Sequence, residues 1–90
     1  MRAAKTDTNQ REIVSALRGM GATVIDTSRM GQGYPDLTVG FQQRTFLIEV
    51  KSDKGKLTPQ QTRFMNRWNG RPVAVVRDVV EAYAVLGIEI

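Results

Sequence analysis

The first clear pattern along the chain is helical. Apolar residues recur every three or four positions after a polar start at Asp7 or Thr8, and the members of this stripe are Ile13, Val14, Leu17 and Met20. Gly19 and Gly21 then interrupt the pattern, as glycines do at the C-terminal end of a helix. Residues 1–6 precede the stripe and are polar and basic, so we expect a flexible arm there.

Three runs with the composition of β-strands follow the helix. Residues 23–27 are short and β-branched, which predicts a strand, and residues 28–35 contain two glycines and a proline, which predicts a loop. Two apolar runs, 37–41 and 44–50, come next. Because only Gln42-Gln43 separates them, we expect these two runs to form a β-hairpin.

The second half of the chain predicts a helix, a strand and a last helix. Thr58 is a suitable N-cap and Pro59 a suitable first helical residue, and Gly70 ends this helix. The stripe that we expect it to bury contains Gln61, Phe64, Met65 and Trp68. The continuous apolar run at 73–76 predicts an interior strand, because it leaves no polar side for solvent.

Asp78 caps the last predicted helix, and Gly87 closes it. The apolar face of this helix comprises Val79, Ala82, Tyr83 and Leu86. The resulting order, αβββαβα, predicts an α/β fold in which helices flank a mixed β-sheet. We expect residues 1–90 to form one domain, since a chain of this length builds only a small core.

Composition narrows the chemistry that is open to this domain. The chain has neither cysteine nor histidine, which removes disulfides, the usual zinc ligands and histidine general-base catalysis. Any metal must therefore be hard and bound by oxygen, as magnesium, manganese and calcium are. The net charge of +4 suits a polyanionic partner, although many basic proteins bind no nucleic acid.

No apolar stretch approaches the length of a membrane span, and the N-terminus lacks the apolar core of a signal peptide. We therefore expect a cytoplasmic protein without a membrane partner.

Acidic residues and one lysine gather at the open end of the predicted hairpin. Asp36 begins its first strand, and Glu49 and Lys51 end its second, two residues apart and so on one face. Asp36 and Glu49 are each about six residues from the turn, which brings their carboxylates together. Carboxylates that converge from different elements, together with the carbonyl of Val50, suit a divalent cation. Lys51 beside such a cation suits phosphodiester hydrolysis, because it would orient a water or stabilise negative charge.

An isolated Glu-x-Lys is usually part of a solvated strand face. Here the flanking residues Phe46, Leu47, Ile48 and Val50 predict a buried strand, and a buried charge needs a partner. The context therefore favours a functional site.

In sequence order, the chain has Glu12, then Gly-Tyr-Pro-Asp-Leu ending at Leu37, then Ile-Glu-Val-Lys-Ser at 48–52. This order resembles the PD-(D/E)xK nuclease superfamily, and most of all the small stand-alone VRR-NUC domains of phages and bacteria. The segment Lys-Leu-Thr-Pro-Gln-Gln at 56–61 is similar to a characteristic segment of that family. The resemblance covers about residues 8–86.

The resemblance implies a restriction-endonuclease-like fold and a nuclease dependent on Mg2+ or Mn2+. It implies that Glu12, Asp36 and Glu49 bind the metal, that Lys51 is catalytic and that Gln61 lies at the site. It further implies a structure-selective DNA endonuclease that resolves Holliday junctions as a homodimer, in a bacterial or phage-infected host cell.

Several of these residues have a second reading from the sequence itself. Glu12 either contacts the metal or is an exposed acid stabilised by the helix dipole. Gln61 either lies at the site or completes a capping box with Thr58. We expect Phe64, Met65 and Trp68 to be core residues rather than a platform for stacked bases.

Basic residues beside these elements are candidates for DNA binding, and each of them could equally belong to a solvated charged face. They are Arg29 in the loop before Asp36, Lys54 and Lys56 after the catalytic strand, and Arg63 and Arg67 on the second helix.

Three other functions stay open at this point. The fold could serve a flap- or end-directed nuclease, a nucleic-acid-binding module without catalysis, or a structural partner in a replication or repair complex.

Overall fold

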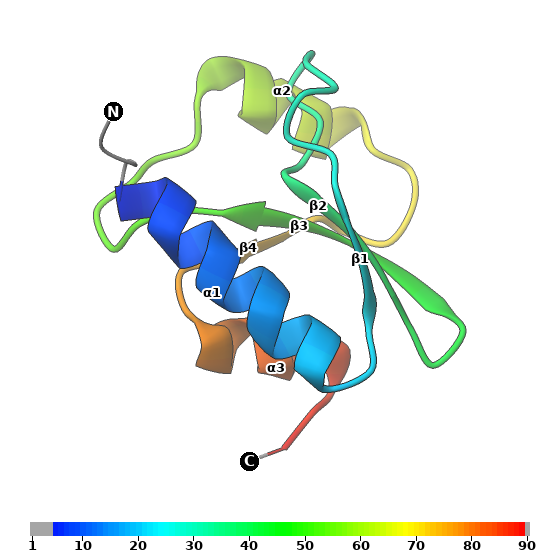
Figure 1. Ribbon diagram of the computed structural model, residues 1–90. Coiled ribbons are helices and arrows are strands. Elements are labelled where there is room, and N and C mark those ends of the chain that lie inside the picture. The colour runs from blue at the N-terminus through cyan, green and yellow to red at the C-terminus, as the bar shows by residue number, and fades with distance from the viewer. Residues whose placement is uncertain (1–4, 90) are drawn as a thin grey trace.

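The structure is a computed structural model that describes residues 5–89, with side chains from Thr8 onward. Seven elements follow one another in the predicted order (Figure 1). They are α1 (Lys5–Gly19), β1 (Thr23–Asp26), β2 (Leu37–Phe41), β3 (Arg44–Val50), α2 (Pro59–Arg67), β4 (Ala74–Val76) and α3 (Val79–Leu86). The prediction of a mixed α/β fold with this order is confirmed.

The four strands form one sheet in the order β1-β2-β3-β4. The pairs β1–β2 and β2–β3 are antiparallel, and β4 pairs in parallel with β3. The tight β2–β3 turn has φ of 52° at Gln42 and 63° at Gln43. Positive φ at both central residues is the signature of a type I′ turn, whose twist matches that of the strands. The hairpin and its register are therefore set by a two-residue turn, as predicted.

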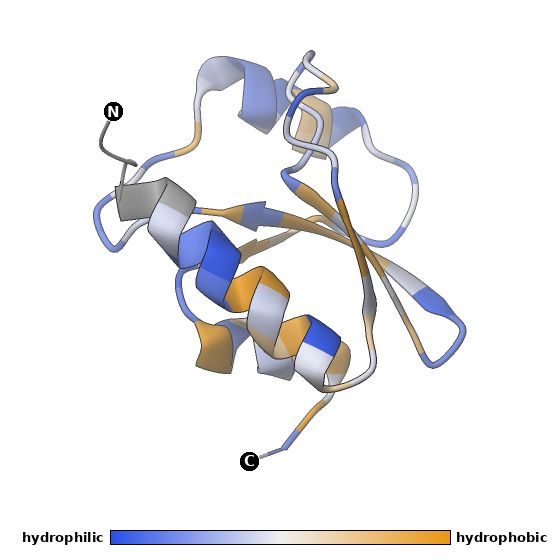
Figure 2. Cartoon of the chain, viewed as in Figure 1, coloured by the Kyte–Doolittle hydropathy of each residue, from blue (hydrophilic) through white to orange (hydrophobic). Residues whose placement is uncertain are grey.

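The main core lies on one face of the sheet, beneath α1 and α3 (Figure 1). Alternate strand residues point to this face and pack against Ile13 and Leu17 from α1 and Ala82 and Leu86 from α3. These strand residues are Val24, Leu37, Val39, Phe46, Ile48, Val50 and Val76. The apolar strands and the inner sides of these helices stand out in Figure 2. This face holds most of the buried apolar surface, which is the main favourable term in folding.

Helix α2 lies away from that core and on the other side of the sheet (Figure 1). None of its residues is buried, and Trp68, its C-cap, is 41% exposed. The prediction that Phe64, Met65 and Trp68 form a buried core stripe is therefore wrong. The helical spacing is correct, but the apolar side of α2 meets the loop before Asp36, through Tyr34, and is only half covered.

The boundaries differ from the predictions at a few ends. Helix α1 begins at Lys5, because neither glycine nor proline stands before the first stripe residue to stop it, while residues 1–4 of the expected arm lie outside the described residues. Helix α2 ends before Gly70, because Trp68 has a ψ of 120°. Strand β4 begins at Ala74, and β1 ends at Asp26.

Among the described residues, no helix is long and apolar enough to cross a membrane.

Candidate active site

The hairpin register brings Asp36 and Glu49 together. Leu37 pairs with Ile48, so the residue before Leu37 stands opposite the residue after Ile48. The Oδ2 atom of Asp36 accepts a hydrogen bond of 2.9 Å from the backbone N–H of Val50. This bond fixes the carboxylate of Asp36 across the end of β3, beside the side chain of Glu49.

Glu49 is a buried charged side chain, with 2% of its surface exposed. The pKa of Glu49 is raised to about 7, first by burial and then by the neighbouring carboxylate of Asp36, while the ammonium group of Lys51 opposes the rise. The Nζ atom of Lys51 lies 3.5 Å from Oε2 of Glu49. A buried carboxylate with a second carboxylate beside it is thus paired with one lysine, which is an arrangement that favours a further positive charge.

Gln61 links α2 to this carboxylate pair. Its Nε2 donates a hydrogen bond of 2.8 Å to Oε2 of Glu49, while its Oε1 accepts one of 2.9 Å from the N–H of Thr58. Thr58 Oγ1 in turn accepts from the N–H of Gln61, which completes a capping box at the start of α2. The two arrangements expected for Gln61 therefore coexist, since one amide serves the helix cap and Glu49 at once.

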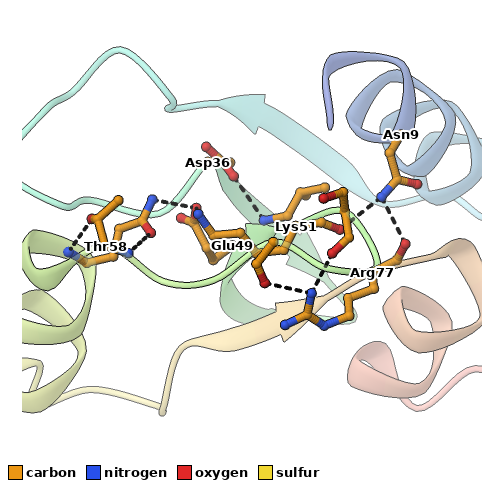
Figure 3. A network of polar contacts seen from close by, with 10 residues as sticks. Asn9, Asp36, Glu49, Lys51, Thr58 and Arg77 are labelled. Atoms are coloured by element: carbon orange, nitrogen blue, oxygen red, sulfur yellow. Dashed lines mark hydrogen bonds and ion pairs between the residues drawn. The ribbon is translucent and has the colours of Figure 1, made fainter. Parts of the chain in front are cut away.

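The backbone at Lys51 is held from two sides, and Figure 3 shows the side formed by Asn9. Its N–H donates to the carbonyl of Val76, and its carbonyl accepts from Nδ2 of Asn9 at 3.1 Å. The same Asn9 nitrogen donates to the carbonyl of Arg77 at 2.8 Å. The guanidinium group of Arg77 donates to the carbonyls of Ser52 and Gly55, which orders the loop after β3. This network fixes the backbone of Lys51 and so the position from which its side chain extends.

A cavity of about 860 Å3 opens over these groups. Asp36, Glu49, Lys51 and Gln61 all line it, and so does Arg29, one of the predicted DNA-binding residues. The structure therefore brings together the predicted site residues of the hairpin, the loop before it and α2.

Helix α1 contributes a second wall that the sequence analysis missed. Its cavity-lining residues are Gln10, Arg11, Val14, Ser15 and Arg18. Gln10, Val14 and Arg18 are four residues apart, so they form a stripe beside the buried Ile13 and Leu17. The sequence could have predicted this wall, because the helical spacing places arginines next to the apolar stripe of Ile13 and Leu17. Arg11 and Arg18 supply positive charge that suits the phosphates of a nucleic acid.

Glu12 lies outside this cavity. Its side chain is exposed and lines a different hollow, together with Asn9, Ser52 and Arg77. Because Gln10 and Val14 line the cavity, Glu12, two residues from each of them, points to another side of the helix. The structure does not bring the expected third acidic ligand to Asp36 and Glu49.

The remaining basic candidates lie at the periphery. Lys54 and Lys56 are exposed in the loop between β3 and α2, outside the cavity lining. Arg63 and Arg67 are exposed on α2 and border a separate hollow.

The donor set suits a magnesium-like cation. Within residues 8–89, no group of three His, Cys, Asp or Glu side chains could enclose a metal ion. Asp36 and Glu49 therefore offer two carboxylates, and the carbonyl of Val50 is the further oxygen expected from the sequence. Mg2+ typically binds one or two carboxylates, keeps several waters and takes up oxygens from the phosphates of its substrate. A site with two carboxylates at an open cavity fits this coordination preference of Mg2+.

Comparisons with known proteins agree with this geometry. The family model described as the VRR-NUC domain matches residues 2–80. A solved structure described as a VRR-NUC domain matches with a TM-score of 0.78 and 27% sequence identity. The match covers 94% of this chain and 97% of that one. No curated protein matches the chain.

Proposed function

Since the chain belongs to the VRR-NUC family of nuclease domains, we propose that it is a metal-dependent endonuclease that hydrolyses phosphodiester bonds in branched DNA. The observation that carries this proposal is the buried Glu49, held between Asp36 and Lys51 at the floor of an open cavity. A pair of carboxylates, one of them buried, with one lysine and no histidine suits oxygen-bound metal chemistry better than any other hydrolytic mechanism.

Each site residue has a role in this proposal. Asp36, Glu49 and the carbonyl of Val50 would hold Mg2+ or Mn2+, which lowers the pKa of a water and neutralises the phosphate. Lys51 orients the attacking water or binds the oxygen on which negative charge develops. Gln61 donates a hydrogen bond to Oε2 of Glu49 and so holds this carboxylate in place.

The arginines of the cavity bind the flanking phosphates. Arg11, Arg18 and Arg29 surround the carboxylates on the α1 and loop sides, so a DNA backbone that enters the cavity meets positive charge there. Such contacts read the backbone and its shape rather than the bases. These contacts agree with an enzyme that recognises its DNA by shape. The four-way junction is the most specific substrate of this kind that we propose.

A cleavage assay with purified protein on linear, flapped and four-way DNA tests the proposal, with Mg2+, Mn2+ or EDTA. We expect cleavage only with metal, and symmetric nicks in the four-way substrate. Cleavage restricted to flaps or ends would replace junction resolution with the alternative activity of the same fold. Binding of DNA without cleavage in any metal would leave a non-catalytic binding module.

Lys51→Ala tests the chemistry within that assay. The cleavage rate should fall by a factor of about 10²–10⁴ while DNA binding is retained. Arg44→Gln is the control, because it removes a cation at the turn end of β3, away from Val50. Equal rates for Lys51→Ala and the parent would contradict the assigned role of Lys51.

We also propose that the protein acts as a homodimer, because paired nicks across a two-fold junction need two active sites related by symmetry. Sedimentation of the free protein and of its junction complex checks the stoichiometry.

A further inference from the structure

A row of aromatic side chains lies on the half-covered side of α2. The rings of Phe64 and Trp68 are stacked, with centroids 5.3 Å apart and an interplanar angle of 18°. The ring of Tyr34 meets Phe64 edge-on, also at 5.3 Å. We call Tyr34, Phe64 and Trp68 the aromatic row.

Water can reach this row. Trp68 is 41% exposed, no residue of α2 is buried, and the neighbouring Met30 is 63% exposed. An apolar patch of this kind on a small domain marks a binding surface, because nothing in the fold requires it to be uncovered.

Polar groups beside the row have the chemistry of nucleotide recognition. Two hollows of about 470 and 180 Å3 border Phe64 and Arg67. The larger one is also lined by Gln32, Gln60, Arg63 and Asn66. Within residues 8–89, no carboxylate forms an ion pair with Arg63 or Arg67. Aromatic rings stack on bases, amides bond to base edges and free arginines bind phosphates, so one surface carries all three.

The aromatic row begins where the active site ends. Gln61, Phe64 and Trp68 are spaced i, i+3 and i+7, so they share one face of α2. Gln61 contacts Glu49, and a helix rises 1.5 Å per residue, which places Trp68 about 10 Å along the axis from the site. A strand whose phosphate is in the cavity would therefore have its next few nucleotides beside the row.

The surface is preformed. Gly33 has a φ of +77°, and a Cβ atom at this position would collide with the carbonyl oxygen of Gln60. The loop before Asp36 thus packs directly on the first turn of α2, which only glycine permits here. A fixed surface loses little conformational entropy on binding.

From these observations we propose that the aromatic row and its arginines bind unpaired nucleotides next to the cleavage site, by stacking of bases on the exposed ring of Trp68, which Phe64 supports. This proposal rests on the proposed nuclease function. It names the class of substrate as DNA with unpaired nucleotides. Bases inside a duplex are stacked on each other, whereas those in a flap, gap or opened junction are free to stack on protein side chains. DNA with unpaired nucleotides beside the scissile bond is therefore preferred over continuous duplex.

Trp68 is the one tryptophan of the chain, so its fluorescence reports on this surface directly. The protein is titrated in EDTA with blunt duplex, with duplex that carries a short unpaired arm, and with the same armed duplex made abasic in the arm. We expect strong quenching by the armed duplex and little by the other two. Equal quenching by the normal and abasic arms would overturn the proposal, because the two differ only in their bases.

Substitution gives the second test. Trp68→Ala should weaken binding of armed duplex about tenfold and leave blunt duplex unchanged, and Trp68→Phe should retain most of the affinity. Met20→Ala is the control, since Met20 is similarly exposed, at 44%, beyond the end of α1. Equal losses for armed and blunt DNA in Trp68→Ala would contradict a role in base stacking.

Two further outcomes separate this proposal from its alternatives. If Trp68→Ala abolishes self-association in sedimentation and leaves DNA selectivity intact, the row is an interface between copies and the proposal is wrong. If the protein selects the armed duplex but cleaves no DNA with any metal, the nuclease function fails and the stacking surface stands.

Discussion

One face of the sheet carries Val39, Ile48 and Val50 beneath α1 and α3, and the other carries Glu49 and Lys51 beside α2. The first face is continuous and apolar, and its residues are almost fully buried. The second buries a carboxylate and leaves the apolar side of its helix half exposed. Successive residues of β3 supply both faces, because side chains along a strand alternate.

The apolar face of the sheet contributes mainly to stability, and the face with Glu49 and Lys51 contributes mainly to the proposed chemistry. Burial of apolar surface stabilises the first face. On the second face, Lys51 and Gln61 interact with the buried Glu49, whose charged form would be better solvated in water. Substitutions on the two faces should therefore differ in kind. Those beneath α1 and α3 should change the free energy of unfolding, and those beside α2 should change activity with little loss of stability.

The largest expected effect is on the core side. Leu17→Ala removes a fully buried side chain of α1 and should lower the free energy of unfolding by about 2–5 kcal/mol. Met65→Ala on α2 is the matched substitution on a half-buried position, with an expected loss of about 1 kcal/mol. Urea denaturation followed by circular dichroism measures both. Equal losses would show that α2 belongs to the same core after all.

Ionisation of Glu49 should give the next largest effect. Its pKa of about 7 in the folded protein exceeds the ordinary value of 4.5, so between these values the folded state binds a proton that the unfolded state lacks. Without metal, stability is therefore full below about pH 4.5 and falls as the pH rises to 7, by about 3 kcal/mol at most.

Glu49→Gln should remove that dependence, because glutamine keeps the hydrogen-bonding shape without the charge. In EDTA, the variant should be more stable than the parent at pH 8 and similar to it at pH 4.5, while it loses cleavage with metal. Denaturation curves across this pH range check the prediction. A parent whose stability rises between pH 5 and 7 would contradict the assigned environment of Glu49.

The sequence predicts the core side well and the site side in part. Strong periodicity defines α1, β2 and β3, and the count from Gln42-Gln43 places Asp36 beside Glu49 because a two-residue turn fixes the register. The apolar spacing of Phe64 and Trp68 predicts a core stripe that the structure does not have, because periodicity shows which residues share a face but not whether another layer covers that face.

The α1 wall of the cavity illustrates a second limit. Arg11 and Glu12 are neighbours in sequence, yet only Arg11 lines the cavity, because a helix turns by about 100° at each residue. Which of the two faces the hairpin depends on the packing of α1 on the sheet, and that is a tertiary property. Asn9 was missed for the same reason, because its partners lie at residues 51 and 77.

A substitution of Asn9 should have a smaller effect, and it should change both stability and cleavage. Asn9→Ala removes the donor to the carbonyls of Lys51 and Arg77, which should cost about 1–3 kcal/mol of stability. Because these bonds also fix the backbone of Lys51, the cleavage rate should fall while DNA affinity is kept. Denaturation and cleavage are measured on the same preparation. A change in stability alone would limit Asn9 to a structural role.

The smallest effects compare the two helix caps. Asp78 Oδ1 accepts from the N–H of Glu81 at 2.8 Å at the start of α3, and Thr58 Oγ1 accepts from Gln61 at 3.1 Å at the start of α2. Asp78→Ala should lower global stability by about 1 kcal/mol, because α3 is part of the core.

Thr58→Ala should lower it less, because α2 can fray without opening the core. Its cleavage rate should fall nevertheless, since the cap holds the amide of Gln61 that reaches Glu49. Thr58→Ser keeps the hydroxyl and should restore the rate. If Thr58→Ala instead behaves like Asp78→Ala, with lost stability and an unchanged rate, then both faces of the sheet would unfold as one unit and Gln61 would have no part in the site.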